Sequence, residues 1–382
     1  MLLPVIIFFS ASFCWSAQKE YPARVRMVLV KVIPLLEKQK YEEAAKILAD
    51  FREKTRGPRD DIHDHAEINF VLGNCYVFMG RPLEASGCYK RAVARDPGHK
   101  GAWHNLAQSL FEAERYIEAG DAFLKCYELS NKKDAKLLYY SGLTLLVAEK
   151  YHKFLERFEK LLIAHPESIV LEWKENYVYG LLHADLPKKA IPFMVELARD
   201  FSGKKQRQWR ELLLQQYMAM EMHDEAMALL QRLSRQEPTE ALWWKGLAHL
   251  YLQTGRYRKA LSALTICSYL GPLSDEEQTL LADLYLQEGI PRKAVLHYEE
   301  QAEKEPRRDL LLHLSRSYLE LDQPERALKV LDEISKKESN GDVEMTRGNI
   351  LYSMKEYDRA AAVFEKAARE KGKKGHRACL MA

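Results

Sequence analysis

The sequence predicts an all-α fold of about ten helix pairs that stack side by side. The first observation is that small and aromatic residues recur every 33 to 36 residues from Ala66 onward. The second is that prolines recur at the ends of these repeats, where they stop a helix because proline has no N–H donor. The third is composition, since 18 Gly and 14 Pro in 382 residues are few for an all-β chain built on tight turns.

The repeats follow one another along the chain at a nearly constant interval. From Ala66 the intervals are 34, 35, 36, 36, 34, 34, 33 and 33 residues, and so small a drift predicts one continuous stack. A longer insertion, Thr55–His65, separates the first repeat from the rest. We place the repeat starts near Val25, Ala66, Lys100, Ala135, Leu171, Arg207, Ala241, Asp275, Arg308 and Gly341.

Small side chains explain how the two helices of a repeat cross closely. Gly73 leaves room on the first helix of its repeat, whereas Phe154 fills the place of a small residue on a second helix. The repeat that contains Phe154 is therefore the least regular. The alanines that recur on second helices are Ala44, Ala85, Ala119, Ala190, Ala226, Ala260, Ala294, Ala327 and Ala360. The prolines expected to close second helices are Pro97, Pro166, Pro238, Pro272 and Pro306.

Charge and cysteine content exclude two broad classes of protein. Lys and Arg total 58 against 55 Asp and Glu, and a net charge of +3 argues against a dedicated nucleic-acid binder. Six cysteines are too few for a disulfide scaffold. Cys126 and Cys267 stand at small, buried places of the repeat, where packing is the expected role. Cys75 and Cys88 lie on the two helices of one repeat, and either free thiols or a disulfide fits the sequence.

The N-terminus predicts an exported protein. Residues 1–16 are expected to form a secretory signal peptide, because Leu2–Phe9 is too short to span a bilayer and small residues follow it, although the segment lacks Lys and Arg. No later window is apolar enough for a membrane span. We expect an N-terminal helical pair and loop over 17–65, the repeat stack over 66–371 and a basic flexible tail over 372–382, with a periplasmic or otherwise exported location.

Motifs for catalysis are missing from the sequence. There is no glycine-rich phosphate loop, no H-E-x-x-H and no C-x-x-C, so we predict no catalytic residue, no metal and no cofactor. His63, Asp64 and His65 form one tight cluster of metal-binding residue types. We expect Asp64 to cap the helix that follows, and keep a metal site as the less favoured alternative.

The pattern Leu72-Gly73, Tyr76, Ala85, Tyr89, Ala92, Pro97 resembles the tetratricopeptide repeat, whose 34-residue unit is a helix–turn–helix. The resemblance implies a right-handed superhelical solenoid. It also implies that places 2, 5, 9 and 12 of the first helices, with some neighbours, line a concave groove that binds proteins or peptides. The groove residues expected here are Phe70, Asn74, His104, Asn105, Gln108, Lys136, Tyr139, Tyr179, Gln215, Lys245 and His249.

Some relatives hold the C-terminal carboxylate of a heat-shock chaperone with a clamp of Lys and Asn. Asn74, Asn105 and Lys136 match this clamp, whereas Phe70 and Tyr140 stand where cations are expected. Losing two cations removes most of the charge-assisted binding. A chaperone-type adaptor is therefore an alternative and not the main prediction.

A closer resemblance lies in the later repeats. The runs Leu250–Leu264, Tyr269–Ser274 and Leu280–Ala294 are similar to periplasmic repeat proteins that accompany TonB–ExbB–ExbD systems in Gram-negative bacteria. This resemblance implies a periplasmic accessory that contacts components of the TonB complex.

Three classes of function remain to be compared. A non-catalytic exported scaffold fits the repeat best. An enzyme or metal protein would have to use the His63–His65 cluster. A cell-wall or glycan-binding solenoid would stack sugars on Tyr139, Tyr179 and Trp243, of which Trp243 is expected to be freer than its packed neighbour Trp244.

Overall fold

A computed structural model describes residues 21–54, 62–337 and 341–370, and every regular element in these ranges is helical. The predicted signal peptide (1–16) and basic tail (372–382) lie outside the described residues. The chain divides into two compact units, residues 1–216 and 217–382, and their boundary lies within helix α11 (Gly203–Ala219).

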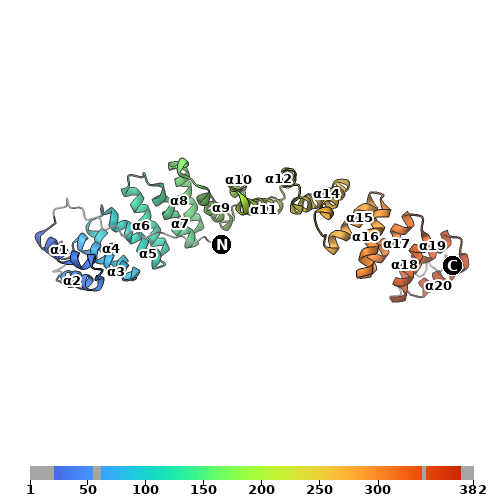
Figure 1. Cartoon of the computed structure of the whole chain (residues 1–382), viewed down its shortest axis with the longest axis horizontal. Coiled ribbons are helices and arrows are strands. Elements are labelled where there is room, and N and C mark those ends of the chain that lie inside the picture. The colour runs from blue at the N-terminus through green and yellow to red at the C-terminus, as the bar shows by residue number, and fades with distance from the viewer. Residues whose placement is uncertain (1–20, 55–61, 338–340, 371–382) are drawn as a thin grey trace. The chain divides into compact units, whose positions relative to one another are not determined.

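In the first unit, consecutive helices pack against each other in chain order, as the blue and green part of Figure 1 shows. Its helices are α1 (Ala23–Glu37), α2 (Tyr41–Glu53), α3 (Ala66–Phe78), α4 (Pro82–Arg95), α5 (Lys100–Glu112), α6 (Tyr116–Leu129), α7 (Ala135–Val147), α8 (Tyr151–Ala164), the short 3-10 helix η1 (Pro166–Ser168), α9 (Leu171–His183) and α10 (Pro187–Asp200).

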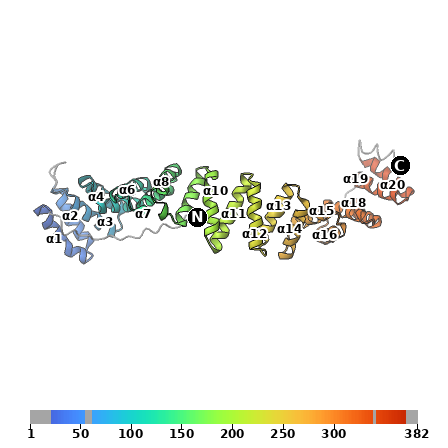
Figure 2. The same ribbon diagram turned by 90° about the horizontal axis from the view of Figure 1, so that it is seen from above.

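The second unit continues the same arrangement, and Figure 2 shows its helices from above. They are α12 (His223–Gln236), α13 (Ala241–Gln253), α14 (Tyr257–Leu270), α15 (Asp275–Gln287), α16 (Pro291–Lys304), α17 (Arg308–Glu320), α18 (Pro324–Lys337), α19 (Gly341–Ser353) and α20 (Tyr357–Glu370). The described residues therefore form ten helix pairs, and the predicted all-α repeat fold is confirmed.

Helix boundaries follow the repeat. Eight of the ten predicted starts coincide with the first residue of a first helix, from Ala66 in α3 to Gly341 in α19. The prolines also stop second helices as predicted, since α4 ends two residues before Pro97 and α16 two residues before Pro306. Two starts differ. Helix α1 begins at Ala23, directly after a proline, and α11 begins at Gly203 rather than Arg207.

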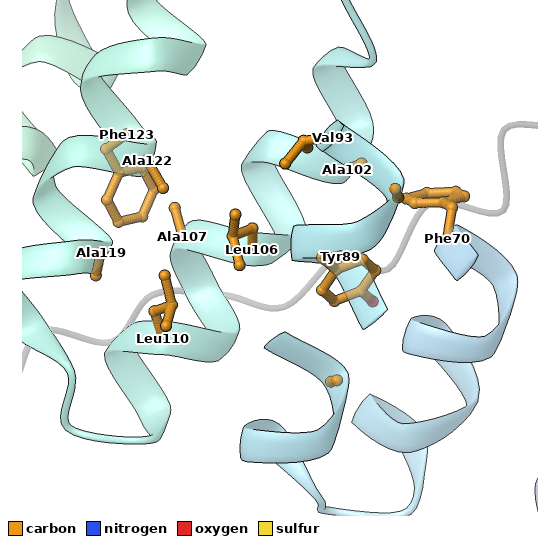
Figure 3. Close-up of a cluster of buried hydrophobic side chains, with 12 residues drawn as sticks. Phe70, Tyr89, Val93, Ala102, Leu106, Ala107, Leu110, Ala119, Ala122 and Phe123 are labelled. Carbon is orange, nitrogen blue, oxygen red and sulfur yellow. The ribbon is translucent and has the colours of Figure 1, made fainter. Parts of the chain in front are cut away.

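Close crossings of paired helices depend on small residues. A Cβ added at Gly73 would lie 2.5 Å from Cε1 of Tyr89, so only glycine lets α3 approach α4 this closely. All nine alanines of the predicted series are buried. Figure 3 shows the same principle one pair further on, where Leu106, Ala107 and Leu110 face Ala119 and Phe123 of the next helix.

Trp243 corrects one expectation. We expected this side chain to be freer than Trp244, but Trp243 is fully buried in α13 and its Nε1 donates a hydrogen bond of 2.8 Å to Glu237. Trp244 is half-buried and donates to the carbonyl of Pro238, as Trp103 does to Pro97. The third place of a first helix is an interior place, filled elsewhere by Ile68.

Within the ranges that the structure describes, none of the helices is both long and apolar enough to cross a membrane.

Candidate functional site

The predicted groove residues fall into a buried and an accessible group. Phe70, Asn74, Gln108 and Tyr139 expose only 8, 3, 5 and 6% of their surface, so packing occupies them in the free chain. His104, Asn105, Tyr179 and Lys245 are half-buried, and Lys136, Gln215 and His249 are exposed. We call the places 2, 5, 6, 9 and 12 of the first helices the first-helix face.

Asn74 belongs to a hydrogen-bonded cluster that ties three helices together. Its Oδ1 accepts a bond of 2.6 Å from the hydroxyl of Tyr89 and a bond of 2.9 Å from Nδ2 of Asn105. These residues come from α3, α4 and α5. None of the three side chains carries a charge near neutral pH, and burial raises the pKa of Tyr89 far above its ordinary value. We name this cluster the neutral station.

Tyr139 joins α7 to the next repeat. Its ring stacks on Trp173 with centroids 4.3 Å apart, and its hydroxyl accepts a bond of 2.6 Å from Nδ2 of Asn176. Burial raises the pKa of Tyr139 to about 12, so the hydroxyl stays protonated. Phe70 is held in a similar way, with its ring 4.7 Å from that of His99.

The accessible residues of the first unit offer several kinds of contact. Lys136 and Gln215 have no side-chain partner among the described residues, and Tyr179 rests against His183 with ring centroids 4.1 Å apart. His104 is half-buried, and burial lowers its pKa, which favours a neutral imidazole. The first-helix face of this unit thus presents a cation, an amide, a phenol and a neutral histidine.

In the second unit, the predicted residues lie on α13. Lys245 forms an ion pair with Glu277, with 2.7 Å between Nζ and Oε1, and Glu277 also closes a capping box with Ser274 at the start of α15. His249 lies one turn further on, 3.2 Å from Nε2 of Gln253. Helices α13 and α15 are therefore linked on this face by a charge pair.

Sequence reasoning missed a second polar cluster, built from Asp283, Tyr298 and His313 of α15, α16 and α17. Nδ1 of His313 lies 2.7 Å from Oδ1 of Asp283 and 3.3 Å from the Tyr298 hydroxyl, which donates to the same carboxylate oxygen. Asp283 and Tyr298 are 15 residues apart, as are Asn74 and Tyr89, so the spacing was a usable signal. We name this cluster the acid–base station.

The His63–His65 cluster has structural contacts. Nδ1 of His65 accepts the backbone N–H of Glu67 and so caps α3, a role we had expected of Asp64. Asp64 instead accepts bonds of 2.9 Å from Asn69 and 2.8 Å from Arg95. In the part of the chain that the structure describes, no group of three His, Cys, Asp or Glu side chains is arranged to hold a metal.

In two alternative binding sites, residues that the site would need are buried or bonded to each other. For the chaperone clamp, Asn74 and Asn105 bond each other, and Phe70 in place of a cation is buried. For a sugar platform, Trp243 and Tyr139 are buried, which leaves Tyr179 alone. Cys75 and Cys88 are buried thiols, and burial raises the pKa of Cys75 to about 12.

Comparisons with known proteins agree with this architecture. Family models described as tetratricopeptide repeat match residues 70–134, 217–284 and 312–374. A TPR repeat-containing protein of Halalkalibacterium halodurans is 26% identical over 113 residues, which make up 29% of this chain and 48% of that protein. The match therefore spans about half of that relative's length.

Two solved structures are also similar. One is a tetratricopeptide repeat protein from Parabacteroides merdae, 15% identical, with 78% of this chain and 99% of that chain covered and a TM-score of 0.33. The other is a chain of the structure of Naa15/Naa10 bound to HypK-THB, 14% identical, with 94% and 68% covered and a TM-score of 0.35. Because both TM-scores are low, these two structures add no support, and the tetratricopeptide resemblance depends on the sequence matches alone.

Proposed function

Because the chain carries tetratricopeptide repeats, we propose that it is a non-catalytic scaffold that binds an extended segment of a protein partner along the first-helix face. Its partner is a protein or peptide and not a nucleic acid, since the net charge is only +3. No cofactor is needed for this role.

One observation carries the proposal. On the first-helix face of the first unit, Lys136 and Gln215 are exposed and bonded to no other side chain among the described residues. Neighbouring places of the same face are fixed by packing, as Tyr139 is by Trp173. A rigid frame that holds free polar groups binds with little loss of side-chain entropy elsewhere, which favours recognition of an extended segment.

The test uses the full chain as bait in extracts of the source cells, followed by affinity measurements with each purified partner. We expect Lys136→Ala combined with Tyr179→Ala to weaken binding about tenfold, as the loss of contacts worth more than about 1 kcal/mol requires. The matched control is Lys153→Ala with Ile163→Ala, which removes an exposed cation and an apolar side chain from α8.

If both double variants bound the partner with equal affinity, the binding surface would have to lie outside the first-helix face. Circular dichroism must show unchanged helicity in both. Alanine at Phe70, Asn74 or Tyr139 is unsuitable here, because these side chains are buried and their loss would change stability as well as binding.

We further propose that the chain is exported and serves as a periplasmic accessory to a TonB–ExbB–ExbD system. The support is the apolar segment within residues 1–16 and the resemblance over residues 250–294. N-terminal sequencing of the protein from fractionated cells would detect cleavage near residue 16. Recovery of TonB, ExbB or ExbD with the bait would support the accessory role, and their absence from the recovered proteins would contradict it.

A further inference from the structure

The neutral and acid–base stations occupy the same places of the repeat but differ in chemistry. Asn74 and Asp283 both hold the ninth place of a first helix, Tyr89 and Tyr298 match on the following second helix, and Asn105 and His313 share the sixth place of the next first helix. In each station one tyrosine hydroxyl donates to the ninth-place oxygen, and the next first helix bonds the same oxygen. The chain thus holds an uncharged and an ionisable version of one arrangement.

The acid–base station is open to solvent, in contrast to its counterpart. The side chains of His313 and Asp283 are 47 and 39% exposed, whereas Asn74 exposes only 3% of its surface. Nδ1 of His313 faces Asp283 and the Tyr298 hydroxyl, so Nε2 lies on the opposite side of the ring. Nε2 has no hydrogen-bond partner among the described residues.

The surroundings of His313 favour its protonated form. The hydrogen bond to Asp283 raises the pKa of His313 above its ordinary value, although partial burial opposes this. Asp309 adds to the rise and Arg316 opposes it, both on α17, and Tyr298 is the titratable group that faces the ring from α16. Burial raises the pKa of Asp283, but the bonds from His313 and Tyr298 outweigh it and hold that pKa below its usual value.

Protonation decides what Nε2 can bind. In the imidazolium form, both ring nitrogens carry a proton, and Nε2 donates a hydrogen bond. When the ring loses one proton, Nδ1 keeps the other because it bonds the Asp283 carboxylate, and Nε2 becomes an acceptor. The exposed edge of His313 therefore changes from donor to acceptor as the pH rises through the pKa.

We propose that the acid–base station is a protonation-controlled docking point at which Nε2 of His313 binds a backbone carbonyl of the partner segment. This inference depends on the proposed function, because it assigns one contact of that same surface and a condition under which the contact forms. The neutral station holds no ionisable pair, so it has no counterpart of this control.

The first test follows the histidine ring signals of the full chain by NMR from pH 5 to 9. We expect the midpoint of His313 to fall in Asp283→Asn, while the midpoint of His104, which lies in the other unit, stays in place. An identical His313 midpoint in the two proteins would overturn the proposal, because the carboxylate would then exert no control.

The second test uses linear peptides selected from a displayed library on the full chain at pH 6. Clones that contact the second unit are those weakened by Leu319→Asp, an exposed change on α17. For these clones, we expect about tenfold weaker binding at pH 8.5 than at pH 6, the size of one lost charge-assisted hydrogen bond. In Asp283→Asn with His313→Asn, which copies the neutral station, the affinity should not depend on pH.

The outcomes separate the two proposals. A library that yields no binder contradicts the proposed function, while the NMR titration still decides whether Asp283 controls His313. Binders with the same affinity at both pH values in the unaltered chain overturn the docking role of His313 and leave the scaffold function intact. A pH response that persists in the double variant also overturns it, because another group would then be titrating.

Discussion

Single residues explain where the repeat departs from its own pattern. Phe154 stands where nine other repeats have alanine, and the sequence alone marks it only as an irregularity. The structure gives the compensation, which is Gly180 on the next helix. A Cβ built at Gly180 would lie 2.5 Å from Cε1 of Phe154, so the large ring uses the space that a side chain would need. Because the two positions are 26 residues apart, no local pattern links them.

This pair predicts a non-additive double-mutant cycle. Gly180→Ala should destabilise the chain by about 1–3 kcal/mol through overpacking, and Phe154→Ala by about 3–5 kcal/mol through the cavity it leaves. In the Phe154→Ala background, the added methyl group at residue 180 meets no ring, and alanine favours a helix over glycine by up to about 1 kcal/mol. Urea unfolding should then find Gly180→Ala neutral or stabilising, and additive effects would contradict direct contact.

At the scale of helices, the repeat period predicts which residues contact the neighbouring helix better than it predicts where a helix begins or ends. Helix α11 begins at Gly203, four residues before the repeat start expected at Arg207. Lys205 there bonds Glu175 at 2.8 Å, and Gln206 bonds the carbonyl of Arg199. The 34-residue spacing identifies the residues that face the neighbouring helix, whereas the end of a helix depends on local bonds that leave no periodic signal.

Buried polar clusters likewise cannot be predicted from the repeat pattern. Glu344 stands at the fourth place of α19, where other repeats have Trp103 or Trp244, and its side chain is fully buried. It is bonded by Ser335 of α18, by Arg347 at 2.5 Å and by Lys366 of α20 at 2.6 Å. One carboxylate thus joins three helices through partners that lie up to 22 residues away.

We predict that Glu344→Ala destabilises the second unit by about 3 kcal/mol, because Lys366 then loses its carboxylate partner and the largely buried Arg347 keeps only its ion pair with Asp332. Burial raises the pKa of Glu344, but bonds from Lys366 and Ser335, with the charge of Arg347, hold it below its ordinary value of 4.5. Its stabilisation is therefore present above about pH 4.5 and lost as the pH falls through the lowered pKa. Denaturant unfolding at pH 7 and pH 4 measures this loss, and the free energy of unfolding of Glu344→Gln should fall less between the two pH values than that of the unaltered chain. An equal loss in Glu344→Gln would assign the acid sensitivity to other carboxyl groups.

At the scale of the whole molecule, the repeat number and the all-helical fold could be read from the sequence, but the candidate site could only be read in part. The period identifies which places belong to the first-helix face, where Lys136 and Gln215 are exposed. The period does not tell which neighbouring side chains cover the other places of this face. Tyr139 is covered because Trp173, 34 residues later on α9, stacks on it, a contact set by three-dimensional packing alone.

The division into two units predicts that destabilisation stays local. In a stack of repeats, each repeat contacts only its neighbours, so stability is the sum of local terms. Ala294 is fully buried on α16, and Ala294→Leu should cost about 1–3 kcal/mol by overpacking. Amide hydrogen exchange should then accelerate in α15–α17 and leave α3–α5 unchanged, because α16 packs against α15 and α17 while residues 66–112 belong to the other unit. Equal acceleration in α3–α5 would instead reveal a single cooperative stack, in which a binding event on either unit would change the stability of both.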